Sequence, residues 1–429
     1  MTNDEYARKE KPMKHVPRVA SPIDGQRGRT PLQRDTQQWI LDYLIQETGR
    51  VFHFQGEGRG DLPKSVRSHA MISKILGQRA QQIEAMALDE LAAGHRETAL
   101  GFYFEAACTY GRAQHPIFEL NEEKKFLYAG IRRCYDQVCA LAPYRLEHIN
   151  IPWNGTFVSG NLHINPSVNG PAPLVFYIPG CDVFKEIYPT PHFNIVHQRG
   201  MHAFSFDGPG QPESNLRGIQ LTSDNYEQAA STALDYLVQR PEIDPEKVVL
   251  HADSFGAFWG MRFAARDHRI KAVAATQASI CNKYIHTDLE SPRWKQLFAF
   301  LTQAEDEEAL DQIMQDMMMN GYMEKIQCPT VMTVGEYDPR APLDEIYPLF
   351  DQMKVSAELW VMADQHHGLS IGGGTIPPWI QANRGVITDW LHDRLAGKPL
   401  AHPGQVVYIQ GENGPNSPNV QIKRKWYQN

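Results

Sequence analysis

From about residue 145 onward, short apolar segments alternate with stretches that have the apolar spacing of helices. This alternation is typical of a mostly parallel β-sheet with helices on both faces, so it limits the fold of this region to the α/β class. The first two apolar segments, at 145–151 and 156–164, are expected to pair as an antiparallel start of the sheet. The remaining six bring the expected strands to eight and lie at 174–178, 202–206, 247–251, 271–275, 330–334 and 357–362.

The strand expected at 247–251 leads directly into a small-residue turn that carries a serine. Residues 252–256 read Ala-Asp-Ser-Phe-Gly, and a helix-compatible stretch begins at Gly256. The usual G-x-S-x-G pattern of a nucleophile elbow has glycine where this chain has Ala252, and alanine still permits close packing. Such a turn exposes the serine hydroxyl above a helix N-terminus. The strand before it and the helix after it favour Ser254 as a nucleophile over an ordinary turn serine.

An acid and a histidine follow in the order that this kind of site requires. Asp338 lies just after the strand expected at 330–334, and His366 and His367 lie just after the strand expected at 357–362. A histidine can take the serine proton while the acid fixes its tautomer and stabilises the imidazolium. We favour His367 as the base because a glycine follows it and because it lies where the loop histidine of such enzymes usually falls. His366 stays open as the alternative.

The site also needs two backbone N–H groups directed at the developing negative charge. The residue after the nucleophile, Phe255, is expected to supply one of them. The loop after the third expected strand is expected to supply the other, from Cys181, with Gly180 allowing a close approach of the backbone. An ordinary turn is the alternative interpretation of this loop. Gly180, Asp182 and His366 are further candidates for lining the substrate pocket.

Two segments resemble the signatures of one group of hydrolases. Residues 180–186, Gly-Cys-Asp-Val-Phe-Lys-Glu, resemble a G-x-D-x-x-K-E signature, and residues 207–214 resemble a D-G-P-G-Q-G-E-S segment in which Pro212 replaces a glycine. The group consists of α/β-hydrolases with an N-terminal helical domain. It includes bacterial 2,6-dihydroxypseudooxynicotine hydrolase and the fungal polyketide-shortening hydrolases of pigment synthesis. The resemblance extends from about residue 66 to about residue 395.

The resemblance implies the α/β-hydrolase fold, a triad of Ser254, Asp338 and His367, no cofactor, and a homodimer. Several members of the group cleave a carbon–carbon bond beside a ketone, which implies a small aromatic or polyketide-like carbonyl substrate. An esterase, lactonase or thioesterase, an acyl-transfer or cyclisation enzyme, and a catalytically idle binding protein stay open as alternatives. One member also uses a carboxylate between the nucleophile and the acid. Asp288 and Glu290 lie in that region, and no motif selects between them.

The composition of the chain excludes several other functions. With a net charge of −8 and no long basic run, nucleic acid is not expected as a partner. No apolar stretch has the length of a membrane span, so no membrane association is expected. The six cysteines form no C-x-x-C pair, which indicates reduced thiols in a cytoplasmic protein. The absence of an H-E-x-x-H or similar ligand spacing indicates that no metal is bound.

The domain organisation follows from the same patterns. Helical spacing recurs at 66–93, 96–114 and 120–141, which predicts an all-α unit before the sheet. We expect this unit to lie over the carboxyl ends of the strands and to close the site, where a cap can exclude water. The predicted divisions are a flexible arm at 1–34, a helical cap domain at 35–144, a catalytic domain at 145–396 with a helical insertion at 280–325, and a tail at 397–429.

Overall fold

The computed structural model describes most of the chain after residue 62. The described residues are 63, 65–66, 71–289, 292–363, 365–367, 378–410, 414–418 and 420–422. The predicted arm at 1–34 lies outside them. Within this part of the chain, no helix is both long enough and apolar enough to cross a membrane.

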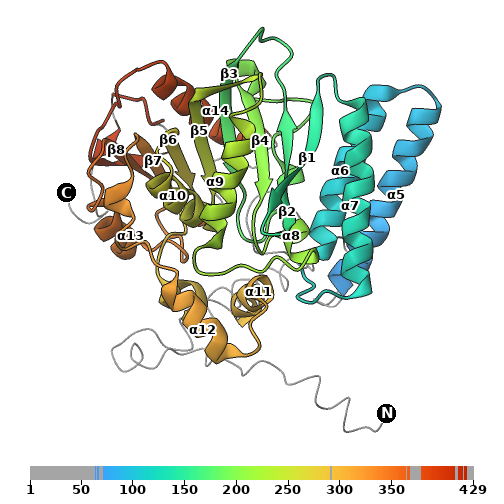
Figure 1. The fold of residues 1–429 in the computed structure, drawn as a ribbon, viewed down its shortest axis with the longest axis horizontal. Coiled ribbons are helices and arrows are strands. Elements are labelled where there is room, and N and C mark those ends of the chain that lie inside the picture. The colour runs from blue at the N-terminus through green and yellow to red at the C-terminus, as the bar shows by residue number, and fades with distance from the viewer. Residues whose placement is uncertain are drawn as a thin grey trace.

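Three long helices form the N-terminal part of the described chain (Figure 1). They are α5 (Ile72–Ala92), α6 (Arg96–Gln114) and α7 (Glu122–Leu141), close to the helices predicted from the sequence. Small residues let them pack closely: a Cβ atom on Gly77 would lie 2.9 Å from Leu127, and one on Gly130 would lie 2.8 Å from the ring of Tyr110. The helices share a buried apolar cluster of their own, separate from the clusters that cover the sheet.

One sheet of ten strands makes up the rest of the core, in the order β1-β2-β4-β3-β5-β6-β7-β8-β9-β10. Neighbouring strands from β4 through β3 to β9 are parallel, whereas β1, β2 and β10 pair with their neighbours in the antiparallel sense. The eight expected strands are all present. The strands are β1 (Leu146–Trp153), β2 (Thr156–His163), β3 (Ala172–Ile178), β4 (His202–Asp207), β5 (Ile243–Asp253), β6 (Ile270–Thr276), β7 (Thr330–Gly335), β8 (Ala357–Met362), β9 (Gln405–Ile409) and β10 (Gln421–Ile422).

The last two strands belong to the segment predicted as a separate tail. β9 pairs in parallel with β8 and is buried from Val406 to Ile409, so the region after 397 extends the catalytic sheet. Its short apolar run is flanked by glycine, proline and asparagine, and this composition obscured the strand in the sequence.

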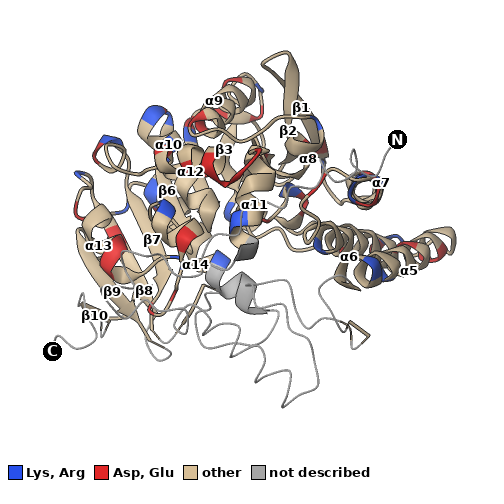
Figure 2. Ribbon diagram, turned by 90° about the horizontal axis from the view of Figure 1, so that it is seen from below, with Lys and Arg blue, Asp and Glu red and all other residues tan. Residues whose placement is uncertain are grey.

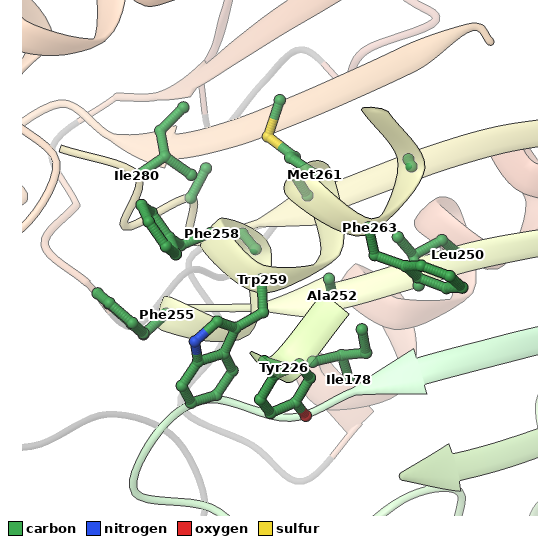
Figure 3. Packing of buried hydrophobic residues seen from close by; sticks show 14 of the residues in the cluster. Ile178, Tyr226, Leu250, Ala252, Phe255, Phe258, Trp259, Met261, Phe263 and Ile280 are labelled. Carbon is green, nitrogen blue, oxygen red and sulfur yellow. The ribbon is translucent and has the colours of Figure 1, made fainter. Parts of the chain in front are cut away.

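Side chains of each central strand alternate between two apolar layers, as the two-residue period of a strand requires. In β3, Leu174 and Phe176 face the layer of α9 and α10, whereas Val175 and Tyr177 face the layer of α14. Figure 3 shows the first layer, where Trp259 and its neighbours on α10 pack over the strands. The covering helices are α9 (Asn225–Leu237), α10 (Phe255–Arg266) and α14 (Pro378–Leu395).

The described helices of the predicted cap lie beside the sheet. α7 packs against β1 and α8 (Pro212–Leu216), so α5, α6 and α7 flank the edge strand (Figures 1 and 2). Leu146 of β1 belongs to their apolar cluster, which accounts for this placement. The same unit also reaches the carboxyl side of the sheet: a Cβ atom on Gly111 of α6 would lie 2.0 Å from the ring of Phe184, and the ring centroids of Phe118 and Phe300 lie 6.5 Å apart. The expected cap role of these helices stays a prediction. The helices at the carboxyl ends of the strands are α11 (Pro292–Thr302) and α12 (Glu307–Asp316), from the predicted insertion.

Candidate active site

The turn between β5 and α10 has the geometry of a nucleophile elbow. Ser254 has φ 57° and ψ −128°, a left-handed conformation that costs energy for any residue except glycine. A Cβ atom on Gly256 would lie 2.5 Å from the carbonyl oxygen of Pro179, so only glycine fits there. The methyl group of Ala252 fits because it faces Gly260, which has no side chain. A Cβ atom on Gly260 would lie only 2.7 Å from Cβ of Ala252.

Three side chains form a continuous chain of hydrogen-bonding atoms at this turn. Ser254 Oγ lies 2.8 Å from Nε2 of His367, and Nδ1 of His367 lies 2.7 Å from Oδ2 of Asp338. Burial alone would raise the pKa of Asp338, but the facing His367 and the nearby Arg340 hold it below its usual value. An ionised Asp338 accepts the Nδ1 proton and leaves Nε2 free to accept the proton of the serine hydroxyl.

The two loops that carry the acid and the histidine are tied together by their backbones. The N–H of Tyr337 donates to the carbonyl of Gln365 over 2.9 Å. A Cβ atom on Gly335 would lie 2.1 Å from the carbonyl oxygen of His366, so the histidine loop crosses directly over this glycine. His366 itself is exposed and contacts the carbonyl of Tyr337 through Nδ1 at 3.1 Å. The structure therefore brings His367, and not His366, against Ser254.

The loop after β3 passes close to the nucleophile. A Cβ atom on Gly180 would lie 3.1 Å from Cβ of Ser254 and 3.5 Å from its Oγ, which shows how near this backbone comes. Cys181 is buried beside it and Asp182 is partly buried. On the other side, Phe255 is the first residue of α10, where a backbone N–H has no partner within the helix. Both expected oxyanion donors thus lie on segments that border Ser254.

Gln211 binds the backbone of the loop after β3 through its side-chain amide. Its Nε2 donates to the carbonyls of Pro179 and Gly180, both over 3.2 Å. Its Oε1 accepts from the N–H of Gly208 over 2.9 Å and from the hydroxyl of Tyr226 over 2.6 Å. The carbonyl of Gly180 and the N–H of Cys181 belong to one trans peptide and point in opposite directions. Fixing this carbonyl therefore directs the N–H of Cys181. Gln211 was not predicted as a site residue, although it lies in the segment that resembles D-G-P-G-Q-G-E-S.

Lys185 forms a buried ion cluster with three carboxylates of the two signature segments. Nζ of Lys185 lies 2.8 Å from Glu186, 3.4 Å from Asp207 and 2.6 Å from Glu213. Lys185 and Glu186 have no exposed surface. Burial raises the pKa of Asp207 to about 7. Burial alone would also raise the pKa of Glu213, but Lys185 holds it far below its usual value. This cluster joins the loops after β3 and β4 in the interior of the protein.

Asp253, next to the nucleophile, takes part in a different network. Its carboxylate accepts from the hydroxyls of Thr276 and of Tyr177, the latter over 2.6 Å, and it lies 3.3 Å from Arg384 of α14. Burial alone would raise its pKa, but His251 and then Arg384 hold the pKa of Asp253 well below its usual value. Asp253 therefore ties the elbow to α14.

Of the two carboxylates that the sequence left open, Asp288 lies within the described residues. Asp288 forms an ion pair with Lys283 at 2.9 Å, and Glu290 lies outside the described residues. Among the described residues, no three His, Cys, Asp or Glu side chains gather in a way that could hold a metal ion.

Comparisons with known proteins place the chain in a family. Residues 80–345 match the family model described as Esterase FrsA-like. The chain is 26% identical over 348 residues to 2,6-dihydropseudooxynicotine hydrolase of Paenarthrobacter nicotinovorans, a match that covers 80% of this chain and 89% of the relative. It is 23% identical over 344 residues to hydrolase LUC6 of Fusarium sp, which covers 68% of this chain and 80% of that protein.

A solved structure is similar over most of the chain. The crystal structure of the 2,6-dihydroxy-pseudo-oxynicotine hydrolase superposes with a TM-score of 0.67 at 24% identity, covering 78% of this chain and 91% of that one. At this identity the likeness shows the shared fold, which is the α/β-hydrolase fold expected from the sequence. The family model spans more than half of the chain, and the similar proteins are hydrolases. This chain is therefore an α/β-hydrolase enzyme and belongs to the family of FrsA-like esterases.

Proposed function

We propose that this protein is a serine hydrolase that cleaves an acyl bond with Ser254, His367 and Asp338 as its triad. The observation that carries the proposal is the unbroken sequence of short contacts, 2.8 Å from Ser254 to His367 and 2.7 Å from His367 to Asp338. A catalytically idle binding protein has no need for this arrangement on a strained turn.

The first step forms a covalent acyl-enzyme. His367 takes the hydroxyl proton as Oγ of Ser254 attacks the substrate carbonyl, and Asp338 stabilises the resulting imidazolium. The N–H groups of Phe255 and Cys181 stabilise the oxyanion. As the intermediate collapses, the bond to the leaving group breaks and His367 gives the proton to that group. Water then attacks the serine ester by the same route and releases the acid.

We further propose that the bond cleaved joins an acyl carbon to another carbon, beside a ketone in a small aromatic or polyketide-like compound. A carbon leaving group must depart as a stabilised enolate, which His367 can protonate. The group of enzymes that the signature segments resemble supports this choice. The proposal includes a homodimer that acts in the cytoplasm, as the resemblance and the scattered cysteines imply.

Hydrolysis of an ester, lactone or thioester is the second candidate, and the family model, described as an esterase, favours it. The two candidates are separated by measuring kcat/KM for a β-diketone and for its ester analogue of equal shape. Measurable cleavage of the diketone supports the carbon–carbon hydrolase. A much larger value for the ester with no cleavage of the diketone overturns it. Analysis of products formed in labelled water distinguishes hydrolysis from acyl transfer or cyclisation.

A further inference from the structure

A buried histidine lies in the segment that follows β6. His286 belongs to a π-helical turn, Tyr284–Asp288, a type of bulge found frequently at functional sites. Only 5% of its surface is exposed. Its ring packs edge-on against Phe255, the residue after the nucleophile, with centroids 5.1 Å apart and an interplanar angle of 83°. His286 is therefore a neighbour of the nucleophile elbow that the triad mechanism does not use.

The surroundings of His286 keep its ring neutral. Burial, followed by the charge of Arg340, lowers the pKa of His286 to about 3. Asp338 and His367 contribute to the same balance, which shows that the triad lies close to this ring. An interaction with the backbone of Cys281 acts in the opposite direction and favours a proton on the ring.

The other nitrogen of the ring is a buried acceptor. Among the described residues, Nε2 of His286 has no hydrogen-bond partner. We assign the proton of the neutral ring to Nδ1, because the interaction with the Cys281 backbone requires a proton-bearing nitrogen and Nε2 has no partner; Nε2 then carries a lone pair. Buried polar atoms are nearly always paired in folded proteins, so an unpaired one beside a catalytic serine requires a reason.

We propose that His286 is a substrate-binding residue whose Nε2 accepts a hydrogen bond from a phenolic or enolic hydroxyl group of the compound that Ser254 attacks. This inference rests on the proposed function and specifies its substrate class. A carboxylate has no proton to donate to a lone pair. An ammonium group would bring a charge against the apolar rings of Phe255 and Phe298, where its desolvation is costly. A neutral hydroxyl is the donor that this environment admits.

The experiment measures how well small ketones protect Ser254 from a fluorophosphonate probe. The ligands are acetophenone and its 2-, 3- and 4-hydroxy derivatives. At least one hydroxy derivative should protect wild-type protein ~10-fold better than acetophenone, the effect of one hydrogen bond of ordinary strength. This advantage should disappear in His286→Phe, which keeps a ring against Phe255. It should return in part in His286→Gln, whose amide can present an acceptor near the position of Nε2.

A second variant, His286→Asn, tests the same hydrogen bond in case His286→Phe does not fold. His286→Asn retains a donor toward Cys281 but has no acceptor at the position of Nε2, so it should also lose the preference for the hydroxyl. Equal protection by all four ketones in wild-type protein, or a preference that survives in both His286→Phe and His286→Asn, overturns the inference. A wild-type protein that the probe does not label at all overturns the proposed function instead, so the two failures are distinguishable.

Discussion

Replacing Gln211 by glutamate tests whether this side chain positions the loop after β3. The substitution keeps an acceptor for Gly208 and Tyr226 but removes the amide that donates to Pro179 and Gly180 over 3.2 Å each. Because the side chain is fully buried, the new carboxyl group is expected to bind a proton and can then donate to only one carbonyl. At least one of the two hydrogen bonds to Pro179 and Gly180 is therefore lost, and both are lost when the carboxyl group is ionised.

The magnitude follows from the number of bonds. Each neutral hydrogen bond contributes about 1 kcal/mol, so the loss is about 1–2 kcal/mol, or about 5- to 30-fold in rate if it falls on the transition state. Complete loss of an oxyanion donor sets the upper limit, about 10²- to 10³-fold in kcat. We therefore expect Gln211→Glu to lower kcat on an aryl ester, and the rate of fluorophosphonate labelling at Ser254, by about 5- to 30-fold. KM should change by less than about threefold, because the donor acts chiefly in the transition state.

The matched control is Tyr226→Phe. It removes the 2.6 Å bond to the other end of the Gln211 amide and keeps the ring stacked on Trp259, with centroids 4.1 Å apart. Its labelling rate should stay within about threefold of wild type. If Gln211→Glu folds normally and labels as fast as wild type, Gln211 does not position this loop, or the loop does not supply an oxyanion donor.

Three further outcomes are expected. Asp338→Asn should keep the fold and lower kcat by about 10⁴-fold, because the amide favours the wrong tautomer of His367; kcat within tenfold of wild type would contradict the role of Asp338. Gly335→Ala should lower both thermal stability and the labelling rate, since its Cβ atom would lie 2.1 Å from the carbonyl oxygen of His366; unchanged melting and labelling would contradict the packing of the two loops. Lys185 depresses the pKa of Glu213, so the stability that this carboxylate contributes is present above its unfolded pKa of about 4.3 and is lost as the pH falls further. Glu213→Gln should therefore lower the free energy of unfolding in urea by about 3–5 kcal/mol at pH 7 and by much less in acid. An equal loss at both pH values would refute the pairing of Glu213 with Lys185.

Local sequence patterns were sufficient for strands β1 to β8 and for the order of the candidate site residues. The strand at 247–251, its small-residue turn and the following helix are contiguous, so Ser254 could be recognised from a single window. Asp338 and His367 were recognisable because each follows an apolar strand directly. Strand β9 was missed because its apolar run is short and lies in a segment rich in glycine and proline.

Contacts between residues far apart in the chain could not be predicted from local sequence patterns. The sequence favoured His367 and left His366 open; the contact that decides between them is the crossing of the histidine loop over Gly335. The role of Gln211 depends on carbonyls more than thirty residues earlier in the chain. The pairing of Asp253 with Arg384 joins segments still further apart. The contact of α7 with β1 was not predicted, because helical spacing shows that a face is buried without showing which partner buries it.

The most direct test of the central claim is to map the fluorophosphonate adduct by mass spectrometry in the folded protein and in two variants. Activation of Ser254 by His367 predicts a single adduct on the peptide that contains Ser254, none in Ser254→Ala, and labelling slowed at least ~10³-fold in His367→Gln. Loss of the adduct in Ser254→Ala with retained melting behaviour would exclude unfolding as the cause. A folded wild-type protein with no adduct at Ser254, or equal labelling rates in wild type and His367→Gln, would contradict the account.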